Sequence, residues 1–325
     1  MTDVPVEWVI LVPLAIAAGI DLYLTLLFLG AALTTQWWQP PLPGSLGELD
    51  SLGVVVTVGA FYVLEFVAER YPPAGLLWNA FHAVIRPVSG ALLAMLLLEG
   101  QGLPIVLGGA VLAAMLTSLA HAVRSGSAIL RWLSPATTPH VLLVSLLEDA
   151  LVLGLLTLVL DRPWWALWVS GVLVVAVIPG AASHARAFAF AVRLVAWRTF
   201  QTLVQRRWLG QDELPPWVRR SLEGDVLAPG GGLRGSPVGA FRLPGVPRFA
   251  TGWVVVRGGS PLFVHRRRVR PSAAIDLGAL EVSGVSDTGL YRRVDLASES
   301  GPGACVFFSV NGPSEESLRA EFLFG

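Results

Sequence analysis

Long apolar runs separated by short polar breaks fill the first part of the chain. They extend from Trp8 to about Gly180, and charged residues return at an ordinary density from Ser183 onward. A membrane-spanning helix needs about 20 apolar residues, and the runs divide into segments of about that length. The pattern therefore predicts an all-α polytopic membrane domain of about six spans, followed by a soluble tail.

The expected spans differ in how cleanly they are bounded. They cover residues 9–33, 52–69, 76–98, 103–123, 141–160 and 164–178. Trp37 and Trp38 follow the first span in a Pro-rich loop that is typical of the membrane interface. Arg86 and Pro87 lie near the middle of the third span. Proline removes a backbone hydrogen bond there, so we expect this helix to be broken into two halves.

Arginine residues in the short loops predict the orientation. The connections after the second and fourth spans carry Arg70, Arg124 and Arg131, whereas the loops on the opposite side carry only Arg162. Because cytoplasmic loops are enriched in basic residues, we expect the bacterial inner membrane as the location, with both termini in the cytoplasm. No cleavable signal peptide is predicted, because the first apolar run is too long for one.

A basic amphipathic helix is predicted after the last span, over residues 183–208, where apolar residues alternate with arginine at near-helical spacing. Such a helix could lie along the inner leaflet and bind anionic lipid, or it could pack on the tail as a connector. The sequence leaves both readings open. The arginines that would contact lipid are Arg186, Arg193, Arg198, Arg206 and Arg207.

The tail has β-strand character. Short β-type runs at 250–257, 261–268, 289–296 and 305–310 are divided by Gly and Pro turn signals. The segment from Arg257 to Ser260 predicts a hairpin turn. We therefore expect a small β-rich cytoplasmic domain over 233–325, joined to the membrane domain (1–182) by a helix and linker over 183–232. The basic run from His265 to Arg270 predicts an exposed strand end or a lipid-facing patch, and is too short to predict nucleic-acid binding.

The two halves of the membrane domain resemble each other around one acidic position. Val-Leu-Glu-Phe-Val at 63–67 is similar to Leu-Leu-Glu-Asp-Ala at 146–150, and each glutamate lies in the second helix of a three-helix group. Because three is an odd number, tandem repeats at about 9–100 and 103–182 would be inverted relative to each other. Many secondary transporters have this arrangement, with their sites near the membrane midplane at broken helices.

Four stretches of the membrane domain resemble a known family. They are AGIDLYLTLLFLG from Ala18, LEFVAERYP from Leu64, LWNAFHAVIRPVSGALLA from Leu77 and SLLEDALVL from Ser145. Over about residues 10–180 the chain is similar to an uncharacterised bacterial membrane family, domain of unknown function 4126. The family pattern has an Asp-Lys pair where Glu69 and Arg70 stand here. The resemblance implies a multi-pass membrane protein and no particular activity.

Composition narrows the remaining classes. The chain is 54% hydrophobic and 14% charged, with a formal net charge of zero, so no overall field favours nucleic acid. The single Cys305 cannot form a disulfide within the chain or a cysteine metal cluster. There is no Gly-x-Ser-x-Gly, His-Glu-x-x-His or P-loop motif, which disfavours an enzyme but leaves open one that acts on lipid.

Acidic side chains at membrane depth are the candidates for chemistry, because such groups are costly there and usually face a bundle interior or a wet cavity. The repeat-related Glu65 and Glu148 would form the centre of a cation- or proton-coupled site, with Asp21 and Asp149 as further ligands. Carboxylates suit hard divalent cations and protons. No cofactor is predicted, since the cation or proton would be the transported species.

An ion-pair lattice that holds helices together is the alternative interpretation. Arginine and histidine side chains would then neutralise the acids, with Glu69 at the cytoplasmic interface. The candidates for counter-charge, or for an anionic head group, are His82, Arg86, His121 and Arg124. We predict a secondary transporter or channel for a cation or small solute. A non-transporting scaffold or lipid-interacting protein whose tail binds a partner is the alternative. The oligomeric state stays open, a homo-oligomer included.

Overall fold

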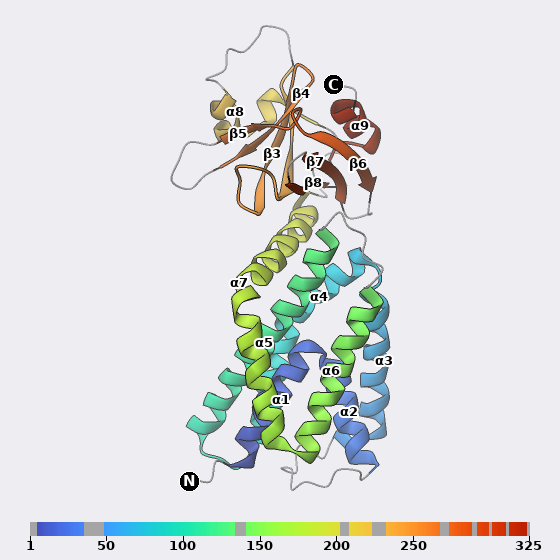
Figure 1. Ribbon diagram of the computed structural model, residues 1–325, viewed down its shortest axis with the longest axis vertical. Coiled ribbons are helices and arrows are strands. Elements are labelled where there is room, and N and C mark those ends of the chain that lie inside the picture. Colours follow the sequence, from blue (N-terminus) through green and yellow to red (C-terminus); the bar gives the residue numbers. More distant parts are fainter. Residues whose placement is uncertain are drawn as a thin grey trace. The chain divides into compact units, whose positions relative to one another are not determined.

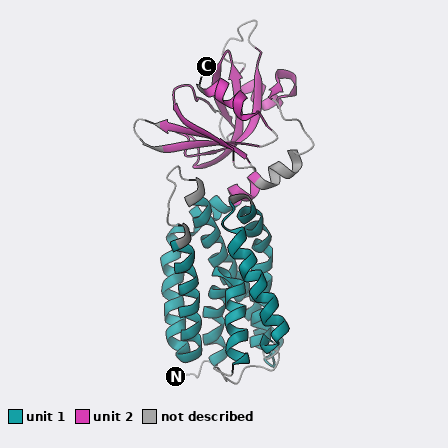
Figure 2. Cartoon of the chain, turned by 90° about the vertical axis from the view of Figure 1, so that its right-hand side faces the viewer, with its two compact units in different colours: residues 1–131, 137–188 teal, residues 132–136, 189–325 magenta. Residues whose placement is uncertain are grey.

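The chain divides into two compact units (Figure 2). The helical unit comprises residues 1–131 and 137–188, and the β unit comprises residues 132–136 and 189–325. The structure is a computed structural model, and it describes residues 5–35, 49–133, 141–201, 208–222, 232–266, 273–287, 291–298, 301–309 and 312–323. The interfacial tryptophans predicted at 37 and 38 lie outside these ranges.

The apolar runs form the helices of the helical unit (Figure 1). The described helices are α1 (Val6–Ile20), α2 (Leu22–Thr34), α3 (Leu52–Ala68), α4 (Pro72–Leu97), α5 (Leu103–Leu133), α6 (Val141–Asp161) and α7 (Pro163–Gln201). The last of these begins in the helical unit and continues into the β unit after residue 188.

The first apolar run is two helices, so the predicted single span over residues 9–33 is wrong. Asp21 separates α1 from α2 with an extended backbone, at φ −141° and ψ 104°. Thr34 at the end of α2 donates a hydrogen bond to the Asp50 carbonyl just before α3, at 3.0 Å. Tyr23 at the start of α2 stacks on Phe61 in the second half of α3, with ring centroids 5.3 Å apart. These contacts show that α2 runs antiparallel to α3.

The start of α1 lies at the same end of the bundle as the end of α2. Gly109, near the start of α5, is in close contact with Trp8 and with Leu98, which follows α4. Gly19, near the end of α1, contacts Thr117 in the middle of α5. Thus α1 is parallel to α5, and α1 and α2 form a helical hairpin that enters and leaves at one end. We call this end the N-terminal end.

The other end of the bundle holds the α3–α4 connection, and we call it the α3–α4 end. Gly75 packs against Ala68 and Glu69 there, and Gly126 of α5 contacts His184 of α7. Helices α3 to α7 alternate in direction between the two ends (Figure 1). The start of α1 and residue 188 are therefore at opposite ends. This differs from the expectation that both ends of the membrane domain share one side, because the first run turns back instead of crossing.

Four helices are long and apolar enough to cross a membrane, among the residues that the structure describes. They are Ala74–Leu97, Leu103–Leu130, Leu143–Asp161 and Pro163–Leu194. Three apolar helices, α1, α2 and α3, are shorter. Large apolar side chains such as Phe81, Met115 and Trp168 are exposed on the outside of the bundle, at 65%, 65% and 71%. This surface identifies an integral membrane protein.

The predicted break at Arg86 and Pro87 is wrong. Helix α4 is continuous from Pro72 to Leu97 with Pro87 inside it. A proline removes one backbone donor, which transmembrane helices tolerate when neighbouring helices hold the segment. Gly90, one turn further along α4, lies so close to Thr117 of α5 that the two helices pack with almost no space between them. The segment of α4 that follows Pro87 is therefore packed closely against α5.

The β unit is built on one antiparallel sheet that forms a half-barrel (Figure 1). The order of its described strands is β5-β4-β3-β2-β8-β7-β6, and β1 also pairs with β2. The strands are β1 (Leu209–Gly210), β2 (Arg234–Phe241), β3 (Phe249–Arg257), β4 (Ser260–His265), β5 (Ala273–Asp276), β6 (Glu281–Asp287), β7 (Tyr291–Ser298) and β8 (Gly301–Ser309). A single-turn helix at Gln211–Glu213 and the helices α8 (Pro216–Leu222) and α9 (Glu315–Leu323) accompany the sheet.

Alternating side chains give the sheet two apolar faces. Val254, Phe263 and Phe308 belong to a buried core that also includes Leu318 of α9. The other face carries an aromatic group against which the end of α7 packs, since Phe190 lies 5.7 Å from Phe249 between ring centroids. The described part of the predicted amphipathic helix, up to Leu194, is thus a continuation of α7 that packs on the tail.

The hairpin predicted at Arg257–Ser260 is confirmed. These two residues face each other in the register of β3 and β4. Gly258 and Gly259 have φ values of 56° and 87°, which side chains other than glycine rarely adopt. The four predicted β runs correspond to β3, β4, β7 and β8, whereas β1, β2, β5 and β6 were not predicted.

Candidate functional site

The site begins at the tip of the α1–α2 hairpin, where Asp21 replaces the missing helical hydrogen bonds. Its Oδ1 accepts a hydrogen bond from the Leu24 amide at 2.8 Å, which caps the start of α2. The Thr25 hydroxyl donates to the Asp21 carbonyl at 2.6 Å. Asp21 is 2% exposed, so this cap lies inside the bundle. An aspartate is suited to the position because its carboxylate can accept from the orphan amides at a helix start.

Arg86 of α4 donates hydrogen bonds to backbone carbonyls on the α1 side of the break. Its Nη1 donates to the carbonyls of Gly19 and Ile20, each at 2.6 Å. These carbonyls close α1, where the helix dipole is negative, so a guanidinium is favoured there. Its Nη2 forms an ion pair with Glu65 Oε1 of α3. Arg86 is fully buried. The arginine therefore joins the hairpin tip to α3.

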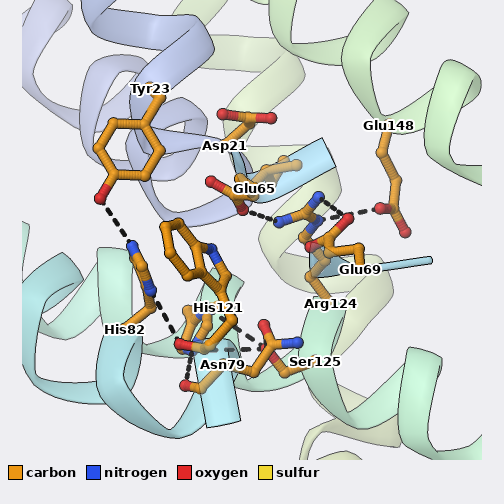
Figure 3. A network of polar contacts seen from close by, with 12 residues as sticks. Asp21, Tyr23, Glu65, Glu69, Asn79, His82, His121, Arg124, Ser125 and Glu148 are labelled. Carbon is orange, nitrogen blue, oxygen red and sulfur yellow. Dashed lines mark hydrogen bonds and ion pairs between the residues drawn. The ribbon is translucent and has the colours of Figure 1, made fainter. Parts of the chain in front are cut away.

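Arg124 of α5 is the centre of a second set of ion pairs (Figure 3). Its three nitrogens donate to Glu65 Oε1 at 2.8 Å, Glu69 Oε2 at 2.9 Å and Glu148 Oε2 at 3.0 Å. Glu65 is shared between Arg124 and Arg86. The predicted pair Glu65 and Glu148 is thus brought together from α3 and α6, with a guanidinium between the two carboxylates. Glu69, expected at the interface, belongs to the same cluster.

Asp21 differs from the other acids of the cluster. Among the described side chains it forms no ion pair within 4.0 Å, and its carboxylate is held by the Leu24 amide. In Figure 3 its side chain lies beside Glu65 at the hairpin tip. Glu65 itself keeps one buried oxygen, Oε2, without a hydrogen-bond partner in the described structure. Asp21 is therefore the acid at the hairpin tip without a guanidinium partner among the described residues, whereas Glu65 has two.

Tyr23, two residues after the break at Asp21, contacts His82 of α4. The His82 Nδ1 donates to the Trp78 carbonyl at 2.8 Å, since a carbonyl can only accept. The neutral ring must then accept at Nε2, where the Tyr23 hydroxyl donates at 2.9 Å. His82 therefore orients a tyrosine and forms no ion pair with the acids in this structure.

His121 and Thr117 of α5 hold the neighbouring helices. His121 Nε2 donates to the Asn79 carbonyl at 3.1 Å, and the Ser125 hydroxyl donates to Asn79 Oδ1 at 2.9 Å. The Thr117 hydroxyl donates to the Ala15 carbonyl of α1 at 3.0 Å. These bonds tie α5 to α4 and α1, so His121 is a packing residue here and carries no counter-charge contact.

Asp149 is separate from the cluster. Its Oδ2 accepts a hydrogen bond from the Tyr62 hydroxyl of α3 at 3.1 Å. Adjacent helical residues point about 100° apart, which is why Glu148 reaches Arg124 and Asp149 does not.

The arrangement does not favour a divalent cation. In the described ranges no three His, Cys, Asp or Glu side chains converge as metal ligands. Arg124 lies where a metal would bridge Glu65, Glu69 and Glu148. The carboxylates of Asp21 and Glu65 are better suited to a proton than to a divalent cation, because a carboxylate takes up a proton without a full coordination shell.

Arg124 was proposed only as a lattice partner, and its role as the centre was missed. A signal was present, because residues three, four and seven apart share one face of a helix. Thr117, His121 and Arg124 follow this spacing on α5, and Asn79, His82 and Arg86 follow it on α4. Two polar stripes on otherwise apolar helices point to one shared interior.

Comparison with known proteins agrees with the resemblance noted in the sequence. The model of a family described as "Domain of unknown function (DUF4126)" matches residues 9–181, which includes the cluster around Arg124. No curated protein and no solved structure matches the chain. The matched segment exceeds half of the chain, and this chain therefore belongs to the DUF4126 family.

Proposed function

We propose that the protein is a secondary transporter in which Asp21, at the tip of a helical hairpin, carries the coupling proton. The observation behind this proposal is a buried carboxylate at a helix break that forms no ion pair among the described residues. Ionisable groups inside a membrane protein are costly and usually mark a pathway for ions or protons. Transporters place such groups where helices are interrupted near the middle of the membrane.

The neighbouring arginines explain how a proton could be coupled to movement. Arg86 holds the carbonyls of Gly19 and Ile20 and also Glu65. Protonation of Asp21 would remove one negative charge beside the Arg86 guanidinium. The electrostatic interactions that hold the hairpin tip against α4 would then change. The polar bonds that hold the hairpin tip include those of Arg86 to the Gly19 and Ile20 carbonyls and that of Tyr23 to His82. Displacement of the hairpin would open the site to one side of the membrane, as alternating access requires.

The orientation follows from the two ends of the helical unit. Arg70 and Arg186 lie at the α3–α4 end, whereas the connection at the N-terminal end that joins α6 to α7 carries Arg162 beside Asp161. By the positive-inside rule the α3–α4 end faces the cytoplasm. The start of α1 would then face the outside. Arg186 and Arg193 are exposed on α7 and would contact anionic lipid, while the side chains of Arg198, Arg206 and Arg207 lie outside the described residues.

Proton flux into proteoliposomes tests the transport proposal. We expect wild-type protein to carry protons down an imposed pH gradient, read by an internal pH-sensitive dye, in the presence of a transported solute from a screen of cations and small solutes. The Asp21→Asn variant should keep its fold, because asparagine also caps a helix, and should lose the flux by about tenfold or more. Asp50→Asn, an exposed aspartate at the N-terminal end, is the matched control and should retain it.

A membrane scaffold is the second candidate, and one observation favours it. Glu65, Glu69 and Glu148 all pair with Arg124, so these acids form a lattice that joins α3, α5 and α6. A scaffold would show no solute-dependent flux above empty liposomes, and Asp21→Asn would then alter nothing but stability. Wild-type flux that survives in Asp21→Asn would likewise contradict the role given to Asp21.

A further inference from the structure

One end of the sheet in the β unit collects arginine side chains from two loops. Strand β2 ends at Phe241 and β3 begins at Phe249, so the connecting loop carries Arg242 and Arg248 at that end. Strand β4 is antiparallel to β3 and pairs its Val264 with Trp253. Its last residue, and Arg266 after it, therefore lie at the same end as the loop. We call Arg242, Arg248 and Arg266 the basic end of the sheet.

The loop holds its two arginines side by side. The Arg242 amide donates to the Arg248 carbonyl at 3.1 Å, which closes the loop. Both guanidinium groups lie over the Phe241 ring, with their carbons 5.0 Å and 5.4 Å from its centroid. Arg242 adopts a φ of 59°, the left-handed region that a bulky residue enters at a cost. Partial burial and the charge of Arg242 lower the pKa of Arg248.

Four arginines elsewhere in the described part of the β unit pair with acidic side chains, and Arg234 with Glu321 is one of these pairs. Arg292, Arg293 and Arg319 pair with Asp287, Asp295 and Glu315 at 3.0, 2.6 and 2.7 Å. By contrast, no acidic side chain in the described part of the chain forms an ion pair with Arg242, Arg248 or Arg266. The loop from Phe241 to Phe249 contains no acidic residue at all. Two like charges held together without a counter-ion form a site for an anion.

The position of the basic end along the chain identifies the anion. Phe190 of α7 lies 5.7 Å from Phe249, between ring centroids, at the start of β3. Phe190 is only two residues beyond residue 188, the last residue of the helical unit. The first residue of β3, at the end of the loop, is therefore in contact with the segment of α7 that directly follows the helical unit in the chain. Pro244 and Pro247 at the loop are exposed and uncharged, so nothing in the loop repels a lipid surface.

We propose that the basic end of the sheet binds the phosphate groups of anionic phospholipids. Arginine forks match phosphate geometry, and each basic residue near an anionic leaflet contributes to membrane attraction. This binding would fix the β unit against the bilayer that holds the helical unit. The site is independent of the transport proposal, because no residue of the hairpin cluster takes part.

Lipid-dependent quenching in nanodiscs tests this site on the full chain. A bimane label at Pro244→Cys reports the loop, while burial raises the pKa of Cys305 to about 12 and keeps that thiol from reacting. Spin-labelled phosphatidylcholine serves as the quencher, in discs of phosphatidylcholine with or without phosphatidylglycerol. We expect stronger quenching with phosphatidylglycerol, weakened by salt. Arg242→Gln and Arg248→Gln should each weaken the lipid-dependent component by about fivefold.

Arg257→Gln is the matched control, because Arg257 lies at the opposite end of β3 from Phe249. It should leave the lipid-dependent quenching unchanged. Equal quenching in both kinds of disc would overturn the proposal, as would a lipid effect that persists in the double variant Arg242→Gln/Arg248→Gln. If inorganic phosphate protects the bimane label from quenching in detergent, and phosphatidylglycerol has no effect in the discs, then the arginines bind a soluble anion. This result would also contradict the proposal.

Discussion

Asp21 in the α1–α2 run and Pro87 in α4 are both residues that can interrupt a helix, and only Asp21 does so. The α1–α2 run breaks at Asp21, whereas α4 continues through Pro87. Proline is the stronger breaker in isolation, at about 3 kcal/mol in a helix interior. Its effect here is nevertheless smaller than that of an aspartate. The difference shows that intrinsic preference does not decide where a buried helix ends.

The partners of the freed backbone groups decide it. At Asp21 the Leu24 amide is capped by the aspartate itself, and two carbonyls are capped by Arg86. Every buried backbone group needs such a partner inside a membrane. The break is therefore stabilised by a side chain 65 residues further along the chain than Asp21. Proline frees only one carbonyl by its missing donor, which the packed neighbourhood of α4 accommodates.

Removal of Arg86 should have the largest effect on this comparison. Arg86→Gln takes a buried guanidinium away from Glu65 and from the Gly19 and Ile20 carbonyls, so the free energy of unfolding in detergent should fall by about 3 kcal/mol or more. Arg70→Gln removes an exposed guanidinium and should cost less than about 1 kcal/mol. Equal losses in the two variants would show that the hairpin tip does not depend on Arg86.

A methyl group at Gly19 should have the next largest effect. An added Cβ would lie 2.6 Å from Ala120 Cβ and 2.6 Å from the Thr117 carbonyl oxygen. Gly19→Ala should therefore destabilise by about 1–3 kcal/mol, because the hairpin would have to move away from α5. Gly108→Ala is the control, since nothing lies within 4 Å of its added Cβ. It should be neutral or stabilise by up to about 1 kcal/mol, as thermal unfolding in detergent would show.

Replacement of Pro87 should have the smallest effect, and its sign is informative. Helix α4 already passes through this residue, so Pro87→Ala restores a backbone donor to a helix that is formed. We expect a gain in stability of about 1 kcal/mol or less. A loss of stability greater than about 1 kcal/mol in the same unfolding assay would mean that α4 depends on Pro87 for its course. Pro87 and Asp21 would then differ less in their effects on the backbone.

The sequence predicted the membrane domain and the β-rich tail because both depend on local patterns. Apolar runs of spanning length and the Gly-Gly hairpin at Arg257–Ser260 are read from neighbouring residues. The hairpin at Asp21 was not predicted, because its decisive partner, Arg86, lies on another helix. The same holds in part for β2, because one of its two neighbours in the sheet, β8, lies far along the chain, at Gly301–Ser309.

The candidate site could be predicted only in part, for a related reason. Charge at membrane depth marked Asp21, Glu65, Glu148 and Arg86 as interior groups. Which acid would pair with which arginine depends on helix rotation and depth, and a composition pattern does not contain these. In the structure Arg124 forms ion pairs with three carboxylates, and none of these three belongs to Asp21. We therefore propose Asp21, and not the Glu65–Glu148 pair, as the acid that carries the coupling proton.

The dependence of the hairpin tip on later helices has a consequence for biosynthesis. The ribosome delivers α1 and α2 before α4 brings Arg86 and before α5 brings Thr117, whose hydroxyl binds the Ala15 carbonyl. Until those donors emerge, the carbonyls of the tip have no partner in lipid and must remain in contact with water or the insertion machinery. The hairpin can therefore make its native polar contacts only after α4 and α5 have been synthesised.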